Sequence, residues 1–584
     1  MKPFSVKSVP VQRVHIWYAL IVCIFAVFTV RLFYLQVIRH DHYKAAAQSD
    51  QYKEYKIAAS RGIIKAHDGD RVVPIVLNHE LFIIYADPQL VKDKDKTVEA
   101  LVQVLGGDRA KYEEAVNAKN RYMVLAKKVP KEQRDALLKH KLPGIGAQAQ
   151  EYRTYPQGTL AAQLLGFVND EGEGKYGLEQ ALNKRLKGTS GELKAVTDIN
   201  GVPLAASEDN IRKPAKPGED LVLTLDIGMQ KQTEQLLKQG LDAARSNSGS
   251  AVILDAKSGA VKAMANYPTY DPANYAQVDD ANVFNNMAVT DALEVGSVMK
   301  PLTAAAALDM GVVKPTTTYY DTSKIKVDDA TVSNIEEDGG PGTKSITDIL
   351  DLSLNTGATW LLMQMGGGNL NKQGREAWYN YMTKHYMFGK STGIEQGYEN
   401  PGVVPSPTEG YGLNITYANT SFGQAMTATI LQMAGAYAAM LNGGTYNQPH
   451  LVESTIDSAG NTKQNNPKVL SRQVVKPQVS QDIQPMLEHV VDTHYFTRKF
   501  SDNYSVGGKT GTAQIASPNG GYLENDFNGT YVGFVGGDTA EYIIAVLVNR
   551  PKIPGYAGSQ AAQPIFGNIA HMLIDNFNVN TKSH

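Results

Sequence analysis

An uncharged apolar run near the N-terminus constrains the fold of this chain more than any other feature. The run from Ile16 to Val30 carries no charge, and the apolar text continues past Arg31 to Ile38. At about 1.5 Å per residue, a helix over this stretch would span the roughly 30 Å of hydrocarbon in a bilayer. Aromatic residues lie towards both ends, as at membrane interfaces: Trp17, Tyr18 and Tyr34. We therefore predict an uncleaved transmembrane anchor at 15–38.

A cleaved signal peptide is the alternative explanation of this run. The small residues that could form a cleavage site, 45–47, lie far beyond the apolar core, with Arg31 and Arg39 between. Positive charges flank the span almost equally, so they do not decide its orientation. The short leading tail, 1–14, and the long trailing chain favour a cytoplasmic N-terminus with the folded bulk outside the cytoplasm.

Composition excludes several classes of protein. A chain of 584 residues predicts two or three folded units, and 42% hydrophobic with 20% charged residues is a globular mixture. A net charge of -2 without a long basic run argues against nucleic-acid binding. The single cysteine, Cys23, cannot form an internal disulfide, and the close histidine pair His40 and His42 has no further ligands nearby. We expect no metal and no cofactor.

The remainder divides into two regions at a segment rich in proline and charge, residues 211–220. The first, 39–218, mixes short strand-like runs with charged helical stretches. The second, 219–576, alternates hairpins and helices, which predicts an α+β domain with an antiparallel sheet flanked by helices, followed by a tail, 577–584. The clearest elements are strand-like runs at 81–85 and 530–548, a hairpin in 249–265, and helices at 131–141, 301–311 and 564–577.

One serine and lysine pair has a spacing suited to nucleophilic catalysis. A serine nucleophile needs a nearby base and an oxyanion hole. Lys300 follows Ser297 by three residues at the start of a predicted helix, so the two side chains share a face. The spacing alone is weak evidence, because Ser323 and Lys326 match it too. That second pair lies in a charged stretch with no helix after it, so we interpret it as unrelated to the site.

A second element, Ser353 and Asn355, forms a Ser-x-Asn pattern on a predicted loop. This pattern is also common, since residues 501–503 and 517–519 match it. It gains weight from its position between the serine and lysine pair and a third, rarer element.

The third element is Lys509-Thr510-Gly511, with Thr512 after it. A given tripeptide is expected about one time in ten by chance at this length. On a strand edge, Lys509 could hold a carboxylate, Thr510 and Thr512 could hydrogen-bond it, and Gly511 would let a backbone approach closely. In this order, the three elements are the signature of β-lactamases and penicillin-binding proteins.

With their flanking text, these elements resemble the class B penicillin-binding proteins, the monofunctional peptidoglycan D,D-transpeptidases. The resemblance covers nearly everything from Arg31 to the last helix, and its most specific stretches are YRTYPQGTLAAQLLGFVND, YGLEQALNKRLKGTSGE, LEVGSVMKPLT, SFGQAMTATILQ and VGGKTGTAQ. It implies an elongated mixed α/β pedestal of the dimerisation type at 39–218 and a transpeptidase domain of the β-lactamase-like fold at 219–576. Val295 departs from the pattern, where the family often has proline, as does KAHDGDR at 65–71.

The family's roles transfer position by position. Ser297 would be acylated by a D-Ala-D-Ala stem peptide, and Lys300 would take its proton. Ser353 would shuttle protons to the leaving amine, and Asn355 would orient Lys300 and the substrate amide. Lys509, Thr510 and Thr512 would hold the substrate carboxylate, and the N–H groups of Ser297 and Thr512 would form the oxyanion hole. The acyl-enzyme would pass to the amine of a second peptide, and β-lactams would acylate the same serine.

Three rival functions use the same fold. A class A β-lactamase needs a Glu-x-x-Leu-Asn pattern after the Ser-x-Asn element, but the pattern occurs at 179–183, before the nucleophile. A D,D-carboxypeptidase would use water as the acceptor, and a β-lactam sensor would not turn over. The pedestal and anchor favour the transpeptidase.

The resemblance also implies partners and a location. It places the chain in the cell membrane with a polytopic membrane glycosyltransferase, contacted through the span around Arg31 and the pedestal, because no second catalytic domain fits before residue 219. The overall length and the compact region between Ser353 and Lys509 are more similar to the division type than to the elongation type.

Overall fold

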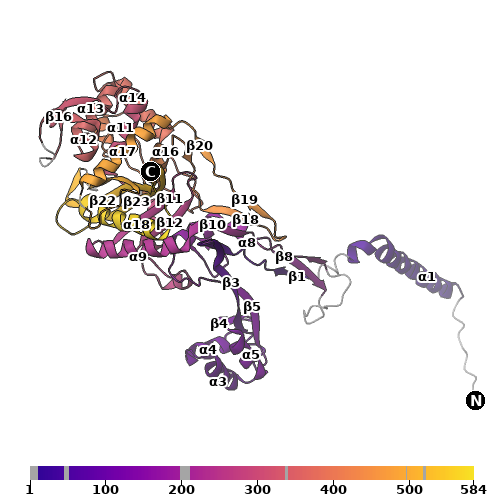
Figure 1. The fold of residues 1–584 in the computed structure, drawn as a ribbon. Helices are drawn as coiled ribbons and strands as arrows, with labels where there is room; N and C mark the ends of the chain where they lie inside the picture. The colour runs from indigo at the N-terminus through magenta and orange to yellow at the C-terminus, as the bar shows by residue number, and fades with distance from the viewer. Residues whose placement is uncertain are drawn as a thin grey trace, which may run out of the picture. The chain divides into compact units, whose positions relative to one another are not determined.

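The computed structural model describes residues 11–44, 52–196, 211–335, 340–494, 496–516 and 521–583. The chain forms two compact units (Figure 1). One unit comprises Met1–Ala59 and Gly188–Pro217, and the other comprises Ser60–Lys187 and Gly218–His584.

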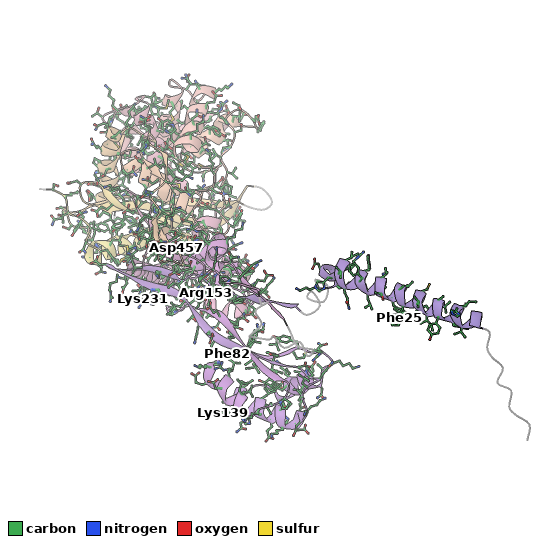
Figure 2. All side chains as sticks on the ribbon, turned by 90° about the vertical axis from the view of Figure 1, so that its right-hand side faces the viewer. Phe25, Phe82, Lys139, Arg153, Lys231 and Asp457 are labelled. Atoms are coloured by element: carbon green, nitrogen blue, oxygen red, sulfur yellow. The ribbon has the colours of Figure 1, made fainter. Side chains whose placement is uncertain are left out.

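The first unit contains the apolar helix and a small sheet. Helix α1, Val11–Phe33, continues into a π-helical turn, η1, Tyr34–Ile38. The segment Val14–Ile38 is long and apolar enough to cross a membrane, and its side chains are exposed, as Phe25 illustrates (Figure 2). The sheet has the order β1-β8-β9, and its antiparallel strands are β1 Tyr52–Ile57, β8 Gly191–Val196 and β9 Ile211–Lys213.

The second unit contains a seven-stranded sheet that includes the long strand β3, Arg71–Ala86. Its first half pairs with β2, Ile64–Asp68, and its second half pairs with β4 and β5, Met123–Val129 and Ile145–Thr154. Strand β2 also pairs in parallel with β10, and the sheet ends on strands from much later in the chain: β10 Asp220–Asp226, β18 Val452–Ile456 and β19 Thr462–Gln464. One sheet therefore joins segments from both predicted regions.

Three helices cover the outer half of β3 and form a small lobe with its own core (Figure 1). Phe82 and Ile84 of β3 are buried against apolar residues of the helices, including Val98, Leu101 and Leu137. The helices are α3 Lys94–Leu105, α4 Arg109–Asn117 and α5 Lys131–Lys139. The predicted strand at 81–85 and helix at 131–141 are confirmed.

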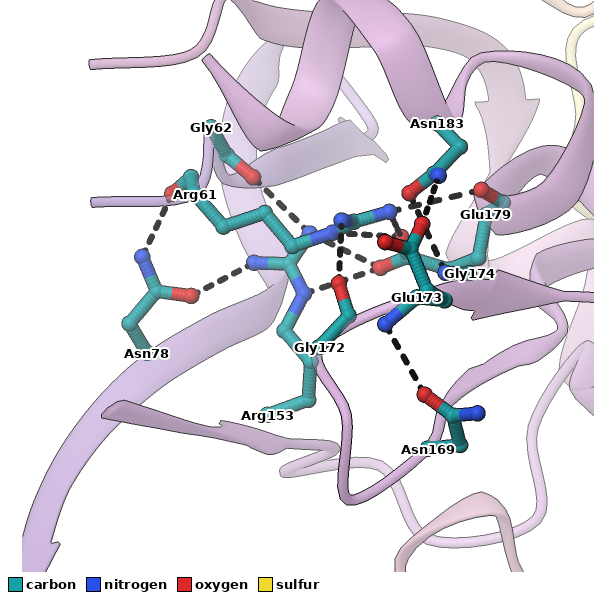
Figure 3. A network of polar contacts seen from close by, with 10 residues as sticks. All are labelled: Arg61, Gly62, Asn78, Arg153, Asn169, Gly172, Glu173, Gly174, Glu179 and Asn183. Atoms are coloured by element: carbon teal, nitrogen blue, oxygen red, sulfur yellow. Dashed lines mark hydrogen bonds and ion pairs between the residues drawn. The ribbon is translucent and has the colours of Figure 1, made fainter. Parts of the chain in front are cut away.

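A buried ion-pair network fastens the base of the pedestal (Figure 3). The side chain of Glu179, on α7 (Gly177–Ala181), has no exposed surface and receives Arg61 on one carboxylate oxygen and Arg153 on the other. The Nε atoms of both arginines lie 2.8 Å from these oxygens. Arg153 also donates to the side chain of Asn78 at 2.7 Å and to the carbonyl of Gly62 at 2.8 Å. Each arginine thus binds one oxygen of the Glu179 carboxylate. These ion pairs hold together the three segments that carry Arg61, Arg153 and Glu179.

A five-stranded antiparallel sheet forms the centre of the remaining part, in the order β12-β11-β23-β22-β21. Alternate side chains of β11 point to opposite faces, so Ala251 and Ile253 belong to one core and Val252 and Leu254 to the other. The strands are β11 Ser248–Asp255, β12 Val261–Tyr267, β21 Ser505–Ala516, β22 Tyr522–Gly536 and β23 Ala540–Asn549. This arrangement confirms the predicted α+β fold with its antiparallel sheet.

Helices cover both faces of this sheet (Figure 1). Helices α9, Ile227–Ala243, and α18, Gln563–Asn576, pack on one face. Helix α16, Ile430–Leu441, packs on the other; it is buried on every side and begins with a capping box between Thr429 and Gln432. The other helices of the part around the five-stranded sheet are α11 Lys300–Asp309, α12 Ile346–Asp351, α13 Asn355–Met365, α14 Lys372–Asn380, α15 Leu413–Thr420 and α17 Pro477–Thr493.

Short elements complete the unit. Two small antiparallel sheets precede α12 in the chain: β13 Thr318–Asp321 pairs with β16 Gly342–Ser345, and β14 Lys324–Val327 forms a hairpin with β15 Ala330–Ser333. Further two-stranded pairs are β6 Phe167–Val168 with β7 Gly174–Lys175, and β17 Tyr446–Asn447 with β20 Val469–Ser471. The single turns are α6 Ala162–Leu165, α8 Asn183–Lys187, α10 Met287–Thr290, η2 Pro272–Gln277, η3 Ala281–Phe284, η4 Gly296–Met299, η5 Tyr381–His385 and η6 Gly558–Ala562.

Candidate active site

Ser297 lies in the 3-10 turn η4, and the α-helix proper begins three residues later at Lys300. The sequence predicted that the serine lies at the start of a regular α-helix, whereas in the structure it lies in a tighter 3-10 turn. In a 3-10 turn, residues i and i+3 are eclipsed, so the side chains of Ser297 and Lys300 leave the backbone on the same side. Lys300 is fully buried and Ser297 is half-buried. Pro301, in the first turn of α11, needs no N–H partner there.

Lys300 is held by the second sequence element. Its Nζ donates to Ser353 Oγ at 3.1 Å and also to the carbonyl oxygen of Ser353. Ser353 lies between α12 and α13 with φ +56°, a conformation that non-glycine residues seldom adopt. Strain of this kind clusters at functional sites. The turn therefore presents both a hydroxyl and a carbonyl to one lysine.

Asn355 is the first residue of α13, and its amide reaches a neighbouring hairpin. Its Nδ2 donates to the carbonyl of Ser333, the last residue of β15, at 3.2 Å. Next to it, Thr356 Oγ1 lies 2.8 Å from Asp321 and 2.9 Å from Asn334. The β13 to β16 segment is thus fastened to the Ser-x-Asn turn by hydrogen bonds, a contact that the sequence did not predict.

The third element lies on β21, the edge strand of the sheet, as its glycine-rich text predicted. Lys509 is 1% exposed, and its Nζ donates to Thr510 Oγ1 at 3.3 Å. A side chain at Gly511 would overlap Thr530 Oγ1 and lie 2.6 Å from the carbonyl of Val295. Thr512 Oγ1 accepts from the N–H of Gly558 at 3.0 Å. Only a glycine fits between β21 and the turn that carries the serine.

Two glycines bring the serine turn against its neighbours. Gly296 has φ +68°, and a Cβ there would lie 2.9 Å from the carbonyl of Thr512. Its N–H donates to the carbonyl of Gly423 at 3.0 Å, and a Cβ on Gly423, at φ +82°, would overlap the carbonyl of Gly296. The structure thereby brings the Ser297 turn, the Ser353 turn and β21 together.

The second serine and lysine pair, Ser323 and Lys326, lies on the β13 to β16 segment and not in the turn that carries Ser297. Ser323 lies in the turn between β13 and β14 with φ +58°, and its N–H donates to Asp321. Lys326 lies on β14, in a hairpin. Residues 501–503 precede β21, and residues 517–519 lie outside the described residues. The sequence context predicted a helix after Ser297 and none after Ser323, and the structure has this arrangement.

Several positioning residues were not found from the sequence. The buried Tyr437, on α16, donates its hydroxyl to the carbonyl of Val298 at 2.6 Å. Thr530 Oγ1, on β22, donates to the carbonyl of Val295 at 2.8 Å. Both contacts hold the serine turn from more than 130 residues away in sequence. No local pattern marks such residues, because each lies in an ordinary apolar helix or strand.

Glu179 of the Glu-x-x-Leu-Asn pattern lies in the pedestal network rather than beside Ser297. Each of its carboxylate oxygens is bound by an arginine side chain. A carboxylate held in this way does not activate a water molecule for deacylation at Ser297.

Comparisons with known proteins identify the family of this chain. Residues 249–571 match the family model described as the penicillin binding protein transpeptidase domain, and residues 56–223 match the penicillin-binding protein dimerisation domain. The chain belongs to the class B penicillin-binding proteins. The resemblance stated from the motifs is therefore confirmed, and the chain is a peptidoglycan D,D-transpeptidase.

Relatives align along most of the chain. Penicillin-binding protein PbpB of Mycolicibacterium smegmatis is 31% identical over 75% of this chain and 67% of its own length. Stage V sporulation protein D of Bacillus subtilis is 29% identical over 94% of this chain and 83% of its own length. Peptidoglycan D,D-transpeptidase FtsI of Escherichia coli K12 is 26% identical over 94% and 89%.

Solved penicillin-binding proteins share the fold. Penicillin binding protein 3 of Mycobacterium tuberculosis, complexed with aztreonam, superposes with a TM-score of 0.67 at 26% identity over 90% of this chain and 98% of that one. Penicillin Binding Protein 2X of Streptococcus thermophilus gives 0.71 at 24% identity, over 91% and 83%.

Replacing Gly423 by alanine is expected to slow acylation by benzylpenicillin at least about tenfold, because the new methyl group overlaps the carbonyl of Gly296 and displaces the serine turn. The rate is measured by stopped flow. Gly443→Ala is the matched control: this glycine also has a positive φ, +87°, but open space around its Cβ position. An equal loss in both variants would mean that backbone strain alone, and not displacement of the turn, sets the rate.

Proposed function

We propose that this transpeptidase works through a serine acyl-enzyme on Ser297. The observation that carries the proposal is the contact between the buried Lys300 and Ser353 Oγ at 3.1 Å, one 3-10 turn from Ser297. A general base must lie within hydrogen-bond reach of the proton that it accepts. Lys300 would take the proton of Ser297 as its oxygen attacks the carbonyl of the penultimate D-alanine.

The walls of the site suit a peptide that ends in a carboxylate. Lys509 and Thr510 carry the donors, and Gly511 allows close approach of a backbone to the turn. The substrate carboxylate would lie against Lys509, Thr510 and Thr512. The N–H groups of Ser297 and Thr512 would stabilise the oxyanion, since preorganised N–H donors act where negative charge develops.

The remaining roles are those that the family resemblance implies. As the peptide C–N bond breaks, Ser353 would pass a proton from Lys300 to the departing D-alanine amine, and Asn355 would orient Lys300 and the substrate amide. The amine of a second stem peptide would then attack the ester, releasing Ser297 and forming the cross-link. β-Lactams would acylate Ser297 in place of the stem peptide.

An acceptor competition separates this function from its rivals. The purified protein is given an N-acyl-D-alanyl thioester donor, with and without a D-amino acid acceptor, and the products are separated by liquid chromatography. We expect the peptide product to form at the expense of hydrolysis as the acceptor concentration rises. Hydrolysis that does not respond to the acceptor would indicate a carboxypeptidase, and rapid turnover of benzylpenicillin would indicate a β-lactamase.

The location and partners follow from the anchor and the pedestal. We propose that α1 anchors the chain in the cell membrane with residues 1–14 in the cytoplasm and the transpeptidase outside it. The helix is exposed along Val14–Ile38, and Arg31 and Arg39 lie over the ring of Tyr34. A basic pair at one end suits contact with a polytopic glycosyltransferase. We also propose 218/219 as the boundary between the pedestal and the catalytic domain.

A role in division is supported by the relatives named FtsI. A fluorescent fusion is expected to gather at the division septum. A uniform signal along the side wall would instead support the elongation role.

A further inference from the structure

Glu294, three residues before Ser297, has one carboxylate oxygen with partners and one without. Its Oε1 accepts from the N–H of Ala425 at 2.9 Å and from the hydroxyl of Tyr522 at 3.1 Å. Its Oε2 is buried and has no hydrogen-bond partner among the described residues. A buried carboxylate oxygen without a partner costs free energy, so its presence beside a reactive serine calls for a ligand.

The hairpin of β21 and β22 shows where along a bound substrate this oxygen lies. Tyr522 pairs with Ala516 in this hairpin, four residues beyond Thr512. β21 is an edge strand, so a donor peptide can add to it with its carboxylate at Lys509 and its N-terminal part towards Ala516. With about 3.3 Å per residue, the amino acid before the acylated D-alanine lies within side-chain reach of Tyr522. Glu294, which accepts a hydrogen bond from Tyr522, would then lie beside that amino acid.

The surroundings of Glu294 favour a cation. The donors on Oε1 are a backbone N–H and a phenol, both neutral. Burial raises the pKa of Tyr522 to about 12, so its hydroxyl stays protonated and acts as a donor. Burial also raises the pKa of Glu294, while the hydrogen bonds from Ala425 and Tyr522 lower it. An ammonium group would supply both the opposite charge and the missing hydrogen bond to Oε2.

We propose that Glu294 is a specificity determinant that binds the side-chain ammonium of a diamino acid immediately before the acylated D-alanine of the donor. This rests on the proposed roles of Ser297 and Lys509. Glu294 would thus recognise a positive charge on the stem peptide, which none of the three sequence elements binds.

Two donors that differ by one charge test the proposal. They are the thioesters of Nα-acetyl-L-lysyl-D-alanine and Nα-acetyl-L-norleucyl-D-alanine, whose side chains are similar in shape. With the full-length protein in detergent, we expect kcat/KM to be about tenfold higher for the lysyl donor. In Glu294→Gln the ratio falls to about one. Asp291→Asn, which removes a nearby carboxyl already bonded to Thr290, is the control and keeps the tenfold ratio.

The outcomes separate the inference from the function beneath it. An unchanged ratio in Glu294→Gln, or an equal loss of kcat/KM with both donors, would overturn the inference, because a merely structural glutamate affects both donors alike. If the wild-type protein were acylated by neither donor, the proposed function would fail and the inference with it.

Discussion

Replacing Lys300 by alanine is expected to slow acylation by benzylpenicillin by roughly a thousandfold, which is the typical contribution of a positioned general base. Lys300 Nζ lies 3.1 Å from Ser353 Oγ in a fully buried position, so bulk water cannot readily take over its role. The rate is measured by stopped flow with purified full-length protein. The melting temperature of the variant is recorded beside it, because the lysine also donates to the Ser353 carbonyl.

The matched control for this variant is Lys326→Ala. Lys326 follows Ser323 with the same spacing but lies on the β14 hairpin. We expect its acylation rate to stay within about twofold of the wild type. A Lys300→Ala variant that melts normally and is acylated at the wild-type rate would show that another group is the base.

Replacing Glu179 by alanine is expected to lower the stability of the second unit by about 3–5 kcal/mol, the usual cost of removing one partner from a buried ion pair. The variant leaves Arg61 and Arg153 facing each other in the base of the pedestal without an anion (Figure 3). Urea denaturation, followed by circular dichroism, measures the change in the free energy of unfolding.

Glu173→Ala is the control for this prediction. Glu173 lies in the same network, but its carboxylate is 41% exposed and pairs with Lys187. Pairs of this kind contribute about 0–1 kcal/mol, so we expect a small change. Equal losses in the two variants would contradict the view that burial of Glu179 sets its importance.

The fold class and the order of the catalytic elements could be predicted because their signals are local. The apolar run, the 249–265 hairpin and the closing helix are each visible in the local pattern of apolar and polar residues. The Lys509-Thr510-Gly511 tripeptide is rare, and the small and apolar residues around it favour a strand edge. The resemblance then supplied what periodicity could not, namely the family and the activity. The domain boundaries and the roles of the site residues stay predictions.

The contacts that shape the site could not be predicted, because they join distant segments. Tyr437 and Thr530 hold the serine turn through backbone carbonyls, which carry no sequence signal. The pairing of β2 with β10 joins strands that belong to different predicted regions. The need for glycine at position 423 becomes visible only in the structure, where the carbonyl of Gly296 lies against it. Tertiary proximity, and not local propensity, decides each of these.

Labelling with a fluorescent penicillin tests the central claim, acylation of Ser297, most directly. The wild-type protein, Ser297→Ala and Ser323→Ala are labelled, denatured and separated on a gel. Ser323 has the same lysine spacing outside the site, so it controls for the substitution itself. We predict a band of full intensity for the wild type and Ser323→Ala and none for Ser297→Ala. A covalent band that survives in Ser297→Ala would contradict the assignment of the nucleophile.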